Sequence, residues 1–236
     1  MDLPEPNNAC DVCSVSPCTR CSGIGICMKC DSMVYCLPGL GELFNKYGSD
    51  KDRNGYTPYY DAIFKNIRGK PLRMLEIGIG TMIPEAPSSM VGYSLPGYSP
   101  GGSLRAWRDY FGNGLIYGID IQPDTQFSEN RITTYIANNT VRHEVDSVLD
   151  TMTFHIILDD GSHYDEHQVL GLINLWHRVV PGGYYIIEDI QPWSRISTDF
   201  RADIQRIVGD SLMYFSEKKN ILIISKNGAV PKRVTG

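Results

Sequence analysis

The chain lacks cysteine over most of its length: all seven cysteines lie between Cys10 and Cys36, and residues 37–236 contain none. It also lacks any apolar run of the ~20 residues that a membrane-spanning helix needs. The first ten residues, MDLPEPNNAC, have neither the basic region nor the hydrophobic region of a signal peptide. We therefore expect a cytoplasmic protein without a membrane partner.

An excess of positive charge is absent too. The formal net charge is −5, and the basic clusters are confined to RAWR, KK and the tail PKR. A protein that binds nucleic acid should instead present a basic face that also carries aromatic side chains. We therefore do not expect nucleic acid as a partner. The length of 236 residues and the apolar fraction of 42% fit one ordinary domain with a small appendage.

The cysteines define the appendage, which we assign to residues 1–39, with the larger domain at 40–236. Three C-x-x-C pairs in so short a segment are typical of structural zinc sites. Disulfides and an iron–sulfur cluster are the alternatives, but the first requires an oxidising compartment and the second uses other spacings. Seven thiolates do not divide evenly between tetrahedral sites, so the number of zinc ions stays open. The predicted ligands are Cys10, Cys13, Cys18, Cys21, Cys27, Cys30 and Cys36.

In the larger domain, apolar runs alternate with helical patterns, which predicts an α/β fold with a doubly wound, mostly parallel sheet of seven strands. The expected strands are 72–77, 115–120, 132–137, 154–159, 184–188, 212–215 and 221–225, the last two forming an edge hairpin. The expected helices are 103–111, 167–180 and 199–208. In the second helix we expect Leu170, Ile173, Trp176 and Val180 to face the sheet, with Pro181-Gly182-Gly183 turning the chain into the next strand.

A long segment without periodicity, residues 81–102, follows the first of these strands. It is rich in Pro, Gly, Ser and Tyr, and loops longer than about 12–15 residues are usually functional or disordered. We interpret it as a substrate lid; a disordered insertion is the alternative.

Two strand ends carry the strongest chemical signal. LDDGSH (158–163) and IIED (186–189) each close an apolar run, and parallel strands place such ends in one crevice. Asp159, Asp160, His163, Glu188 and Asp189 should therefore meet there. Carboxylates so close repel one another unless a cation neutralises them, and hard divalent ions prefer oxygen ligands. The pattern predicts metal-assisted chemistry on an oxygen, with a histidine base; simple capping of the following helix is the alternative.

A cofactor site is indicated where LEIGIG (75–80) closes the first strand. Its glycines permit close approach of a ligand, although the E-x-G-x-G spacing differs from that of dinucleotide binders. The next strand ends in Asp120, which is placed to accept the hydroxyls of a ribose. The alternative is that Asp120 only caps a turn before Gln122-Pro123.

Taken in order, YGSDK (47–51), GYTPYY (55–60), LEIGIG, GGSLRAWRDYF (101–111), IYGIDI, FHIILDDGSH and PGGYYIIEDI resemble a known family. They are similar to the class I S-adenosylmethionine-dependent, metal-dependent sugar O-methyltransferases of the mycinamicin/macrocin group. The resemblance covers roughly residues 40–226. It departs from the family at Ala137-Asn138-Asn139, in the length of the 81–102 loop, and in the cysteine-rich segment.

The resemblance implies a role for each matching position. Asp160, Glu188 and Asp189 would hold Mg²⁺ (or Mn²⁺), and His163 would be the general base. Glu76 and Gly78 would line the methionine end of the cofactor, Asp120 its ribose and Asn138 its adenine, with Ser103 near its carboxylate; Asp159 is counted among the cofactor-binding residues. Relatives are oligomeric, so the resemblance also implies a homo-oligomer.

These observations predict transfer of a methyl group from S-adenosylmethionine to a sugar hydroxyl of a small molecule or glycan. Two other functions are kept open. One is an RNA methyltransferase that docks its substrate through the zinc module, and the other is a non-catalytic scaffold.

Overall fold

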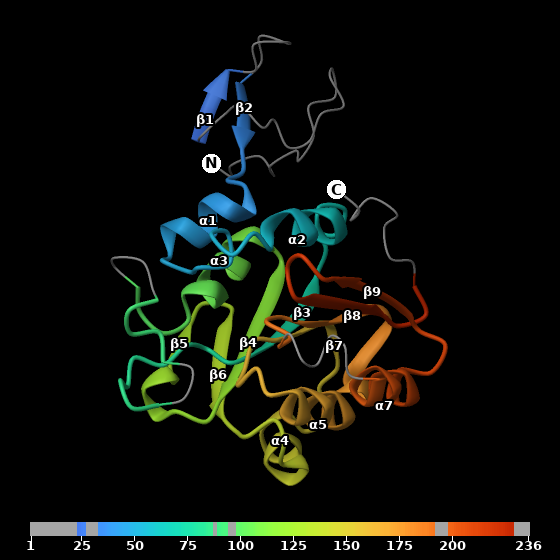
Figure 1. Cartoon of the computed structure of the whole chain (residues 1–236). Coiled ribbons are helices and arrows are strands. Elements are labelled where there is room, and N and C mark those ends of the chain that lie inside the picture. The colour runs from blue at the N-terminus through green and yellow to red at the C-terminus, as the bar shows by residue number, and fades with distance from the viewer. Residues whose placement is uncertain (1–22, 27–32, 87–88, 94–97, 192–197, 229–236) are drawn as a thin grey trace.

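The computed structural model describes residues 23–26, 33–86, 89–93, 98–191 and 198–228. Two strands near the N-terminus, β1 (Gly23–Ile26) and β2 (Met33–Cys36), pair antiparallel as a separate sheet (Figure 1). The cysteine ligands predicted between positions 10 and 30 lie outside the described residues, and of Cys36 only the backbone is described. Within the described residues, no helix is both long and apolar enough to cross a bilayer.

A sheet of eight strands forms the centre of the larger domain, in the order β5-β6-β4-β3-β7-β8-β10-β9. The five strands from β6 to β8 run parallel, whereas β5 and β10 are antiparallel to their neighbours. Buried parallel strands need apolar residues on both faces, which these sequences supply. The strands are β3 (Leu72–Ile77), β4 (Gly114–Asp120), β5 (Ser128–Glu129), β6 (Ile132–Ile136), β7 (Phe154–Asp159), β8 (Val179–Ile187), β9 (Leu212–Ser216) and β10 (Ile221–Ser225).

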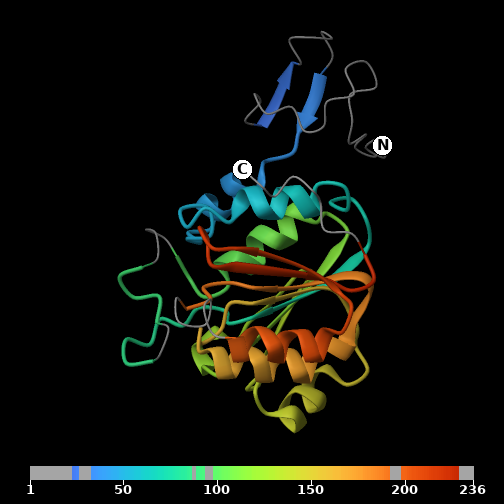
Figure 2. The same cartoon turned by 45° about the vertical axis from the view of Figure 1, so that its right-hand side comes forward.

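Helices cover both faces of this sheet, giving the three layers visible in Figure 2. One face carries α1 (Leu40–Lys46), α2 (Thr57–Phe64) and α3 (Gly102–Tyr110). The other carries α4 (Arg142–Leu149), α5 (Asp165–Leu175) and α7 (Thr198–Val208). Two 3₁₀ turns, Pro123–Thr125 and Trp176–Arg178, complete the described elements.

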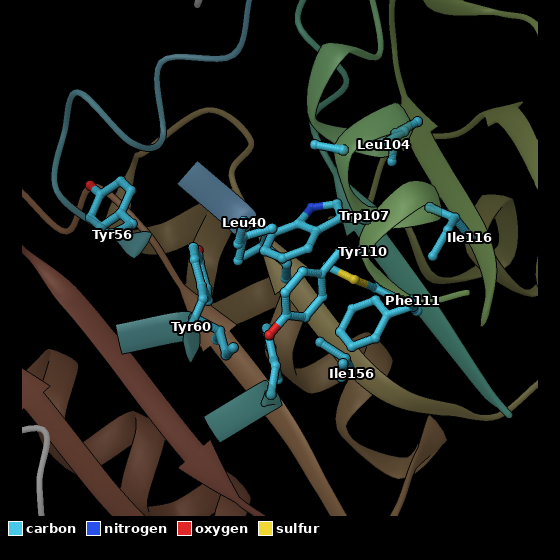
Figure 3. Packing of buried hydrophobic residues seen from close by; sticks show 14 of the residues in the cluster. Leu40, Tyr56, Tyr60, Leu104, Trp107, Tyr110, Phe111, Ile116 and Ile156 are labelled. Carbon is cyan, nitrogen blue, oxygen red and sulfur yellow. The ribbon is translucent and has the colours of Figure 1, made fainter. Parts of the chain in front are cut away.

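An aromatic core lies between the sheet and the first helical layer (Figure 3). The ring of Trp107 contacts Phe44 and Tyr60 edge-on, with centroids 4.9 and 5.0 Å apart. Such edge-to-face pairs add about 0.5–1.5 kcal/mol to the burial of their area. The core therefore fixes α1, α2 and α3 against the strands from which the site is built.

Strand alternation decides toward which helical layer each site residue points. In β3, Met74 packs under α1–α3, whereas Leu75 and Ile77 pack on the opposite face. Because side chains alternate with a period of two, Glu76 shares the face of Met74. The same rule places Glu188 with Ile186 on that face, and Asp159 with Ile157 on the other.

The expected α/β class, the mostly parallel sheet and the edge hairpin are confirmed. The expected strand count of seven is wrong, because the two-residue β5 adds an eighth strand at the edge beyond β6. A strand this short, paired at only two positions, leaves no alternating pattern in the sequence.

The predicted buried face of α5 is also wrong. Leu170 and Ile173 are 41% and 45% exposed, while the buried positions are Gln168, Gly171, Leu172, Asn174 and Leu175. Part of the buried face of α5 is formed by a polar residue, Gln168, and a small one, Gly171. A prediction based on hydrophobicity alone therefore placed the buried face at neighbouring positions of the helix. The prediction that Pro181-Gly182-Gly183 turns the chain into the next strand is also wrong. These residues lie within β8, where its pairing with β7 shifts register between Phe154 and Ile156.

Candidate functional site

A cavity of about 270 Å³ opens at the carboxyl ends of β3, β4, β6, β7 and β8. This is where ligands bind in open parallel sheets, because the loops after neighbouring strands diverge there. Most of the predicted site residues of the larger domain line it: Gly78, Ser103, Asp120, Asn138, Asp160, His163, Glu188 and Asp189. Glu76 and Asp159 do not.

The loop after β3 forms the floor of one half of the cavity. Gly78 has a φ of +84°, and a Cβ built there would lie 2.1 Å from the carbonyl oxygen of Asp160. Only glycine combines this backbone conformation with so close an approach. The Ile79 amide donates to Asp120 Oδ2 at 2.7 Å, so the carboxylate at the end of β4 also holds the loop in place.

Asp120 has a second backbone partner, since its Oδ1 accepts the Gln122 N–H at 2.9 Å. The turn-capping alternative is therefore part of its role. Each carboxylate oxygen can accept more than one hydrogen bond, and Asp120 lines the cavity. The side chain can thus organise the turn and still receive a ligand hydroxyl.

Asn138 lies next to this half, at the end of β6. Its Oδ1 accepts hydrogen bonds from the backbone and the hydroxyl of Thr140, at 3.0 and 2.8 Å, and its N–H donates to Glu144. Asn138 also lines the cavity. Asn138 is therefore a fixed part of the cavity wall.

Glu76 lies behind the cavity wall, fully buried. Its Oε2 accepts the indole N–H of Trp107 at 3.1 Å, and its other oxygen lies 3.3 Å from Lys51 Nζ. Burial raises the pKa of Glu76 to about 7, an effect that Lys51 opposes. The prediction that Glu76 lines the cofactor directly is not met by this placement. Its carboxylate acts on the cavity through Lys51 and through Ser103, with which it also interacts.

The other half of the cavity is acidic. Ligand atoms of Asp160, His163 and Asp189 all lie within 4.8 Å of one another, which is close enough for one ion. Both His163 and Asp189 adopt left-handed backbone conformations, with φ of +62° and +49°. Such conformations are strained for non-glycine residues and cluster at functional sites. His163 Nδ1 is buried without a hydrogen-bond partner among the described residues.

Glu188 points into the same region but is held differently. Its Oε2 lies 2.5 Å from Lys51 Nζ, and its Oε1 accepts a hydrogen bond from the Tyr60 hydroxyl. Asp160 shares the lysine at 2.6 Å, so Asp160 and Glu188 face a common point. The two strand ends therefore converge, although Glu188 is not in the closest three-residue group.

Lys51 is the largest omission of the sequence analysis. The residue is 2% exposed and its ammonium contacts three carboxylates, those of Glu76, Asp160 and Glu188. Burial alone would lower the pKa of Lys51, but the three acids outweigh this effect and hold the pKa well above its usual value. A buried, permanently charged ammonium thus neutralises part of the acidic half.

Two tyrosines of the GYTPYY segment were missed as well. Tyr60 donates to Glu188, and Tyr56 donates to Asp189 Oδ1 at 2.6 Å. They lie one helical turn apart, at i and i+4, at the start of α2. That spacing was visible in the sequence, but nothing in it showed that α2 packs over the ends of β7 and β8.

Asp159 does not enter the crevice, contrary to the prediction. It faces α5, with Oδ1 accepting the Gly161 N–H at 3.2 Å and Oδ2 accepting from the Tyr185 hydroxyl at 3.4 Å. Burial raises its pKa to about 7. Strand alternation is the reason: Asp159 is the last residue of β7, whereas Asp160 follows the strand and turns into the cavity.

The described part of the 81–102 loop is tied to this cavity. Thr81 and the Met82 amide bind the carboxylate of Asp124, at 2.6 and 2.8 Å. The Tyr98 hydroxyl donates to the carbonyls of Ile79 and Gly80, and Tyr98 and Met90 line the cavity. These contacts agree with a wall of the site, and the interpretation of the loop as a lid stays a prediction.

The other four histidines are all exposed. His143, His155 and His177 do not line the cavity. His167 does line it, and its Nδ1 is hydrogen-bonded to Ser162 Oγ at 2.7 Å.

No family model matches the chain. The solved structure of MycE methyltransferase from the mycinamycin biosynthetic pathway, in complex with Mg and SAH, superposes with a TM-score of 0.62 at 28% identity. The match covers 83% of this chain and 56% of that one. The chain has a class I methyltransferase fold.

Proteins similar in sequence are also named as methyltransferases. Demethylmacrocin O-methyltransferase of Streptomyces fradiae is 37% identical over 169 residues, which is 70% of this chain and 39% of that protein. Mycinamicin VI 2''-O-methyltransferase of Micromonospora griseorubida is 36% identical over 180 residues, 74% of this chain and 42% of that protein. The chain thus spans less than half the length of these curated relatives.

Proposed function

We propose that the protein transfers a methyl group from S-adenosylmethionine to a hydroxyl of a sugar. The observation that carries the proposal is a single cavity that joins a glycine-lined loop and an acidic residue at the end of β4 to an acidic cluster with a histidine. The first half suits a nucleoside cofactor, and the second suits activation of an alcohol. Similarity to enzymes named as O-methyltransferases, one of them for the 2'-position of a rhamnosyl tetracenomycin, supports the choice of reaction.

In this proposal the cofactor lies along the loop after β3. Gly78 lets its methionine part approach the backbone, and Asp120 accepts its ribose hydroxyls. Asn138 presents its side-chain amide beside the adenine. Ser103 lies near the cofactor carboxylate, and Glu76 acts from behind through Lys51.

A divalent cation fits the acidic half, because ligand atoms of Asp160, His163 and Asp189 lie within 4.8 Å of one another, and Glu188 shares the Lys51 ammonium with Asp160. We propose Asp160, Glu188 and Asp189 as its ligands, with oxygen donors that suit Mg²⁺ or Mn²⁺. Such an ion lowers the pKa of a bound alcohol as a Lewis acid. Lys51 and Tyr60 hold Glu188 in place, and Tyr56 holds Asp189.

His163 is the proposed general base. It is the histidine beside the acidic residues, and its turn is fixed by the Asp160 N–H donating to the Ile77 carbonyl. General base catalysis typically contributes roughly 10²–10⁴-fold to a rate. The reaction needs one proton removed from the acceptor hydroxyl as the methyl group is transferred, and His163 would accept it.

The test is methyl transfer from isotopically labelled S-adenosylmethionine to a panel of rhamnosides and nucleotide sugars, with Mg²⁺ present. His163→Ala should lower kcat by about 10²-fold or more and leave the Kd of the cofactor unchanged. His143→Ala, exposed and outside the cavity, is the matched control. EDTA should abolish turnover and added Mg²⁺ should restore it. A fully active His163→Ala protein would remove the base assignment.

We further propose that residues 1–39 form a module held together by zinc through the seven cysteines. So short a segment cannot bury a core of its own, and structural zinc supplies roughly 10–16 kcal/mol of binding free energy in small peptides. Metal analysis of the full chain should find zinc, and replacing Cys27 and Cys30 with serine should reduce it. Iron or intact disulfides in its place would refute the proposal.

A further inference from the structure

An exposed aromatic side chain stands at the mouth of the cavity. Tyr164 is 56% exposed, yet it lines the same cavity as Asp160, His163 and Asp189. Its neighbour in sequence, His163, is the proposed base. A large ring left open beside a reactive centre is the type of surface that binds a ligand, whereas scattered exposed side chains need no explanation.

Tyr164 is held in place from two sides. It is the N-cap residue of α5, and its carbonyl accepts the Gln168 N–H at 2.9 Å. Its ring contacts His167 at a centroid distance of 5.5 Å and an interplanar angle of 74°. His167 is in turn bonded to Ser162. A T-shaped contact covers at most one face of one ring, and Tyr164 is 56% exposed, so its ring keeps an open face.

The cavity also carries polar groups that are suited to hydroxyls. Asp50 and Asn54 line it and are hydrogen-bonded to each other at 3.0 Å. The Asp50 carboxylate and the Asn54 amide retain further capacity to bind hydroxyl groups. The cavity thus offers an apolar platform, a polar wall and an acidic end within about 270 Å³.

We propose that Tyr164 determines acceptor specificity by stacking against the apolar C–H face of a pyranose ring. A sugar ring has such a face together with a rim of hydroxyls, which matches the platform and the polar wall. A catechol ring would also stack on Tyr164, but it has only two hydroxyls. With these at the acidic end of the cavity, none would be left for Asp50 and Asn54. This inference rests on the proposed function, and it narrows the acceptor to a pyranose without a bulky substituent on the stacked face.

The test measures binding rather than turnover. Calorimetric titration of methyl α-L-rhamnopyranoside into the full chain, saturated with S-adenosylhomocysteine and Mg²⁺, gives the Kd of the sugar. Tyr164→Ala should raise this Kd about tenfold, whereas Tyr164→Phe should stay within about threefold because the ring is kept. Leu170→Ala, at another exposed position on α5 that does not line the cavity, should change nothing. The Kd of S-adenosylhomocysteine should be the same in all four proteins, which also shows that they are folded.

Three outcomes would overturn the inference: no binding of the glycoside to the wild type, equal binding by Tyr164→Ala, or tighter binding of catechol than of the glycoside. Binding that depends on Tyr164 in a protein that transfers no methyl group would leave this inference standing and refute the proposed function. The two proposals therefore fail separately.

Discussion

Replacing Lys51 with methionine should destabilise the protein far more than the loss of an ordinary ion pair. The Lys51 ammonium lies 2.5, 2.6 and 3.3 Å from Glu188, Asp160 and Glu76, and the lysine side chain is only 2% exposed. Glu188 and Glu76 are themselves 1% and 0% exposed, so water cannot replace the lost partner. Breaking a buried pair on one side typically costs about 3–5 kcal/mol, because the remaining charge is left uncompensated. We expect Lys51→Met to fall in that range.

The assay is urea denaturation at neutral pH, followed by tryptophan fluorescence, since Trp107 is buried against Glu76. Lys46→Met is the matched control: Lys46 pairs with Asp109 at 3.2 Å but is 59% exposed. Exposed ion pairs contribute about 0–1 kcal/mol, so this variant should unfold almost as the wild type does.

A double variant separates charge from packing. Lys51→Met combined with Glu188→Gln removes one of the stranded carboxylates, while Tyr60 can still donate to the amide oxygen. The free energy of unfolding of the double variant should exceed the value predicted by adding the effects of the two single changes, by about 1–3 kcal/mol. If Lys51→Met loses less than about 1 kcal/mol, or if the two changes are additive, the assignment of Lys51 as a compensating charge is wrong.

Three further changes test the surrounding geometry. Gly78→Ala should abolish calorimetric binding of S-adenosylhomocysteine, since its Cβ would meet the Asp160 carbonyl at 2.1 Å and its φ is +84°; retained binding would contradict this packing. Tyr60→Phe should lower the free energy of unfolding by about 1–3 kcal/mol in urea, because Glu188 loses a buried donor; an unchanged midpoint would show that the bond is unimportant. Asp159→Asn should stabilise the protein at pH 8, by roughly 1–4 kcal/mol, because a carboxyl whose pKa rises to about 7 on folding opposes folding when it is ionised. That gain should shrink as the pH falls from 7 toward 4, where the folded carboxyl is protonated, and an equal gain at both ends of a thermal-unfolding pH series would refute the cause.

Much of the fold was predictable because local signals and tertiary environment agree. The strand ending at Asp159 is apolar on both faces, as a central parallel strand must be, and its predicted bounds match β7. The inward face of α5 was not predictable from hydrophobicity, since Gln168 is buried and donates to the Glu188 carbonyl at 3.1 Å, whereas Leu170 is exposed. A polar side chain with a specific backbone partner carries no periodic signal.

In the candidate site, too, some residues could be predicted from the sequence and others could not. Residues at a strand end or directly after one, such as Gly78, Asp120 and Asp160, could be placed from sequence because the sheet fixes where strand ends lie. Lys51 could not, because it comes from a turn before the first strand of the sheet, and its burial depends on α1 and α2 packing over that end. Asp159 was misplaced for a simpler reason: two adjacent aspartates were treated as equivalent, although only the one beyond the strand turns toward the cavity.

Charge balance explains why these residues belong together. Glu76, Asp160, Glu188 and Asp189 would carry four negative charges when ionised, and Lys51 supplies one positive charge. Under the proposed function, a divalent ion would contribute two more and the sulfonium cofactor one, which together with Lys51 would balance the four carboxylates when all are ionised. Methyl transfer would remove the sulfonium charge, and a proton accepted by His163 would replace it within the same cavity. A buried site of this kind avoids an uncompensated charge before and after the reaction, which a protein interior tolerates poorly. The lysine is therefore as much a part of the proposed chemistry as the acids that it contacts.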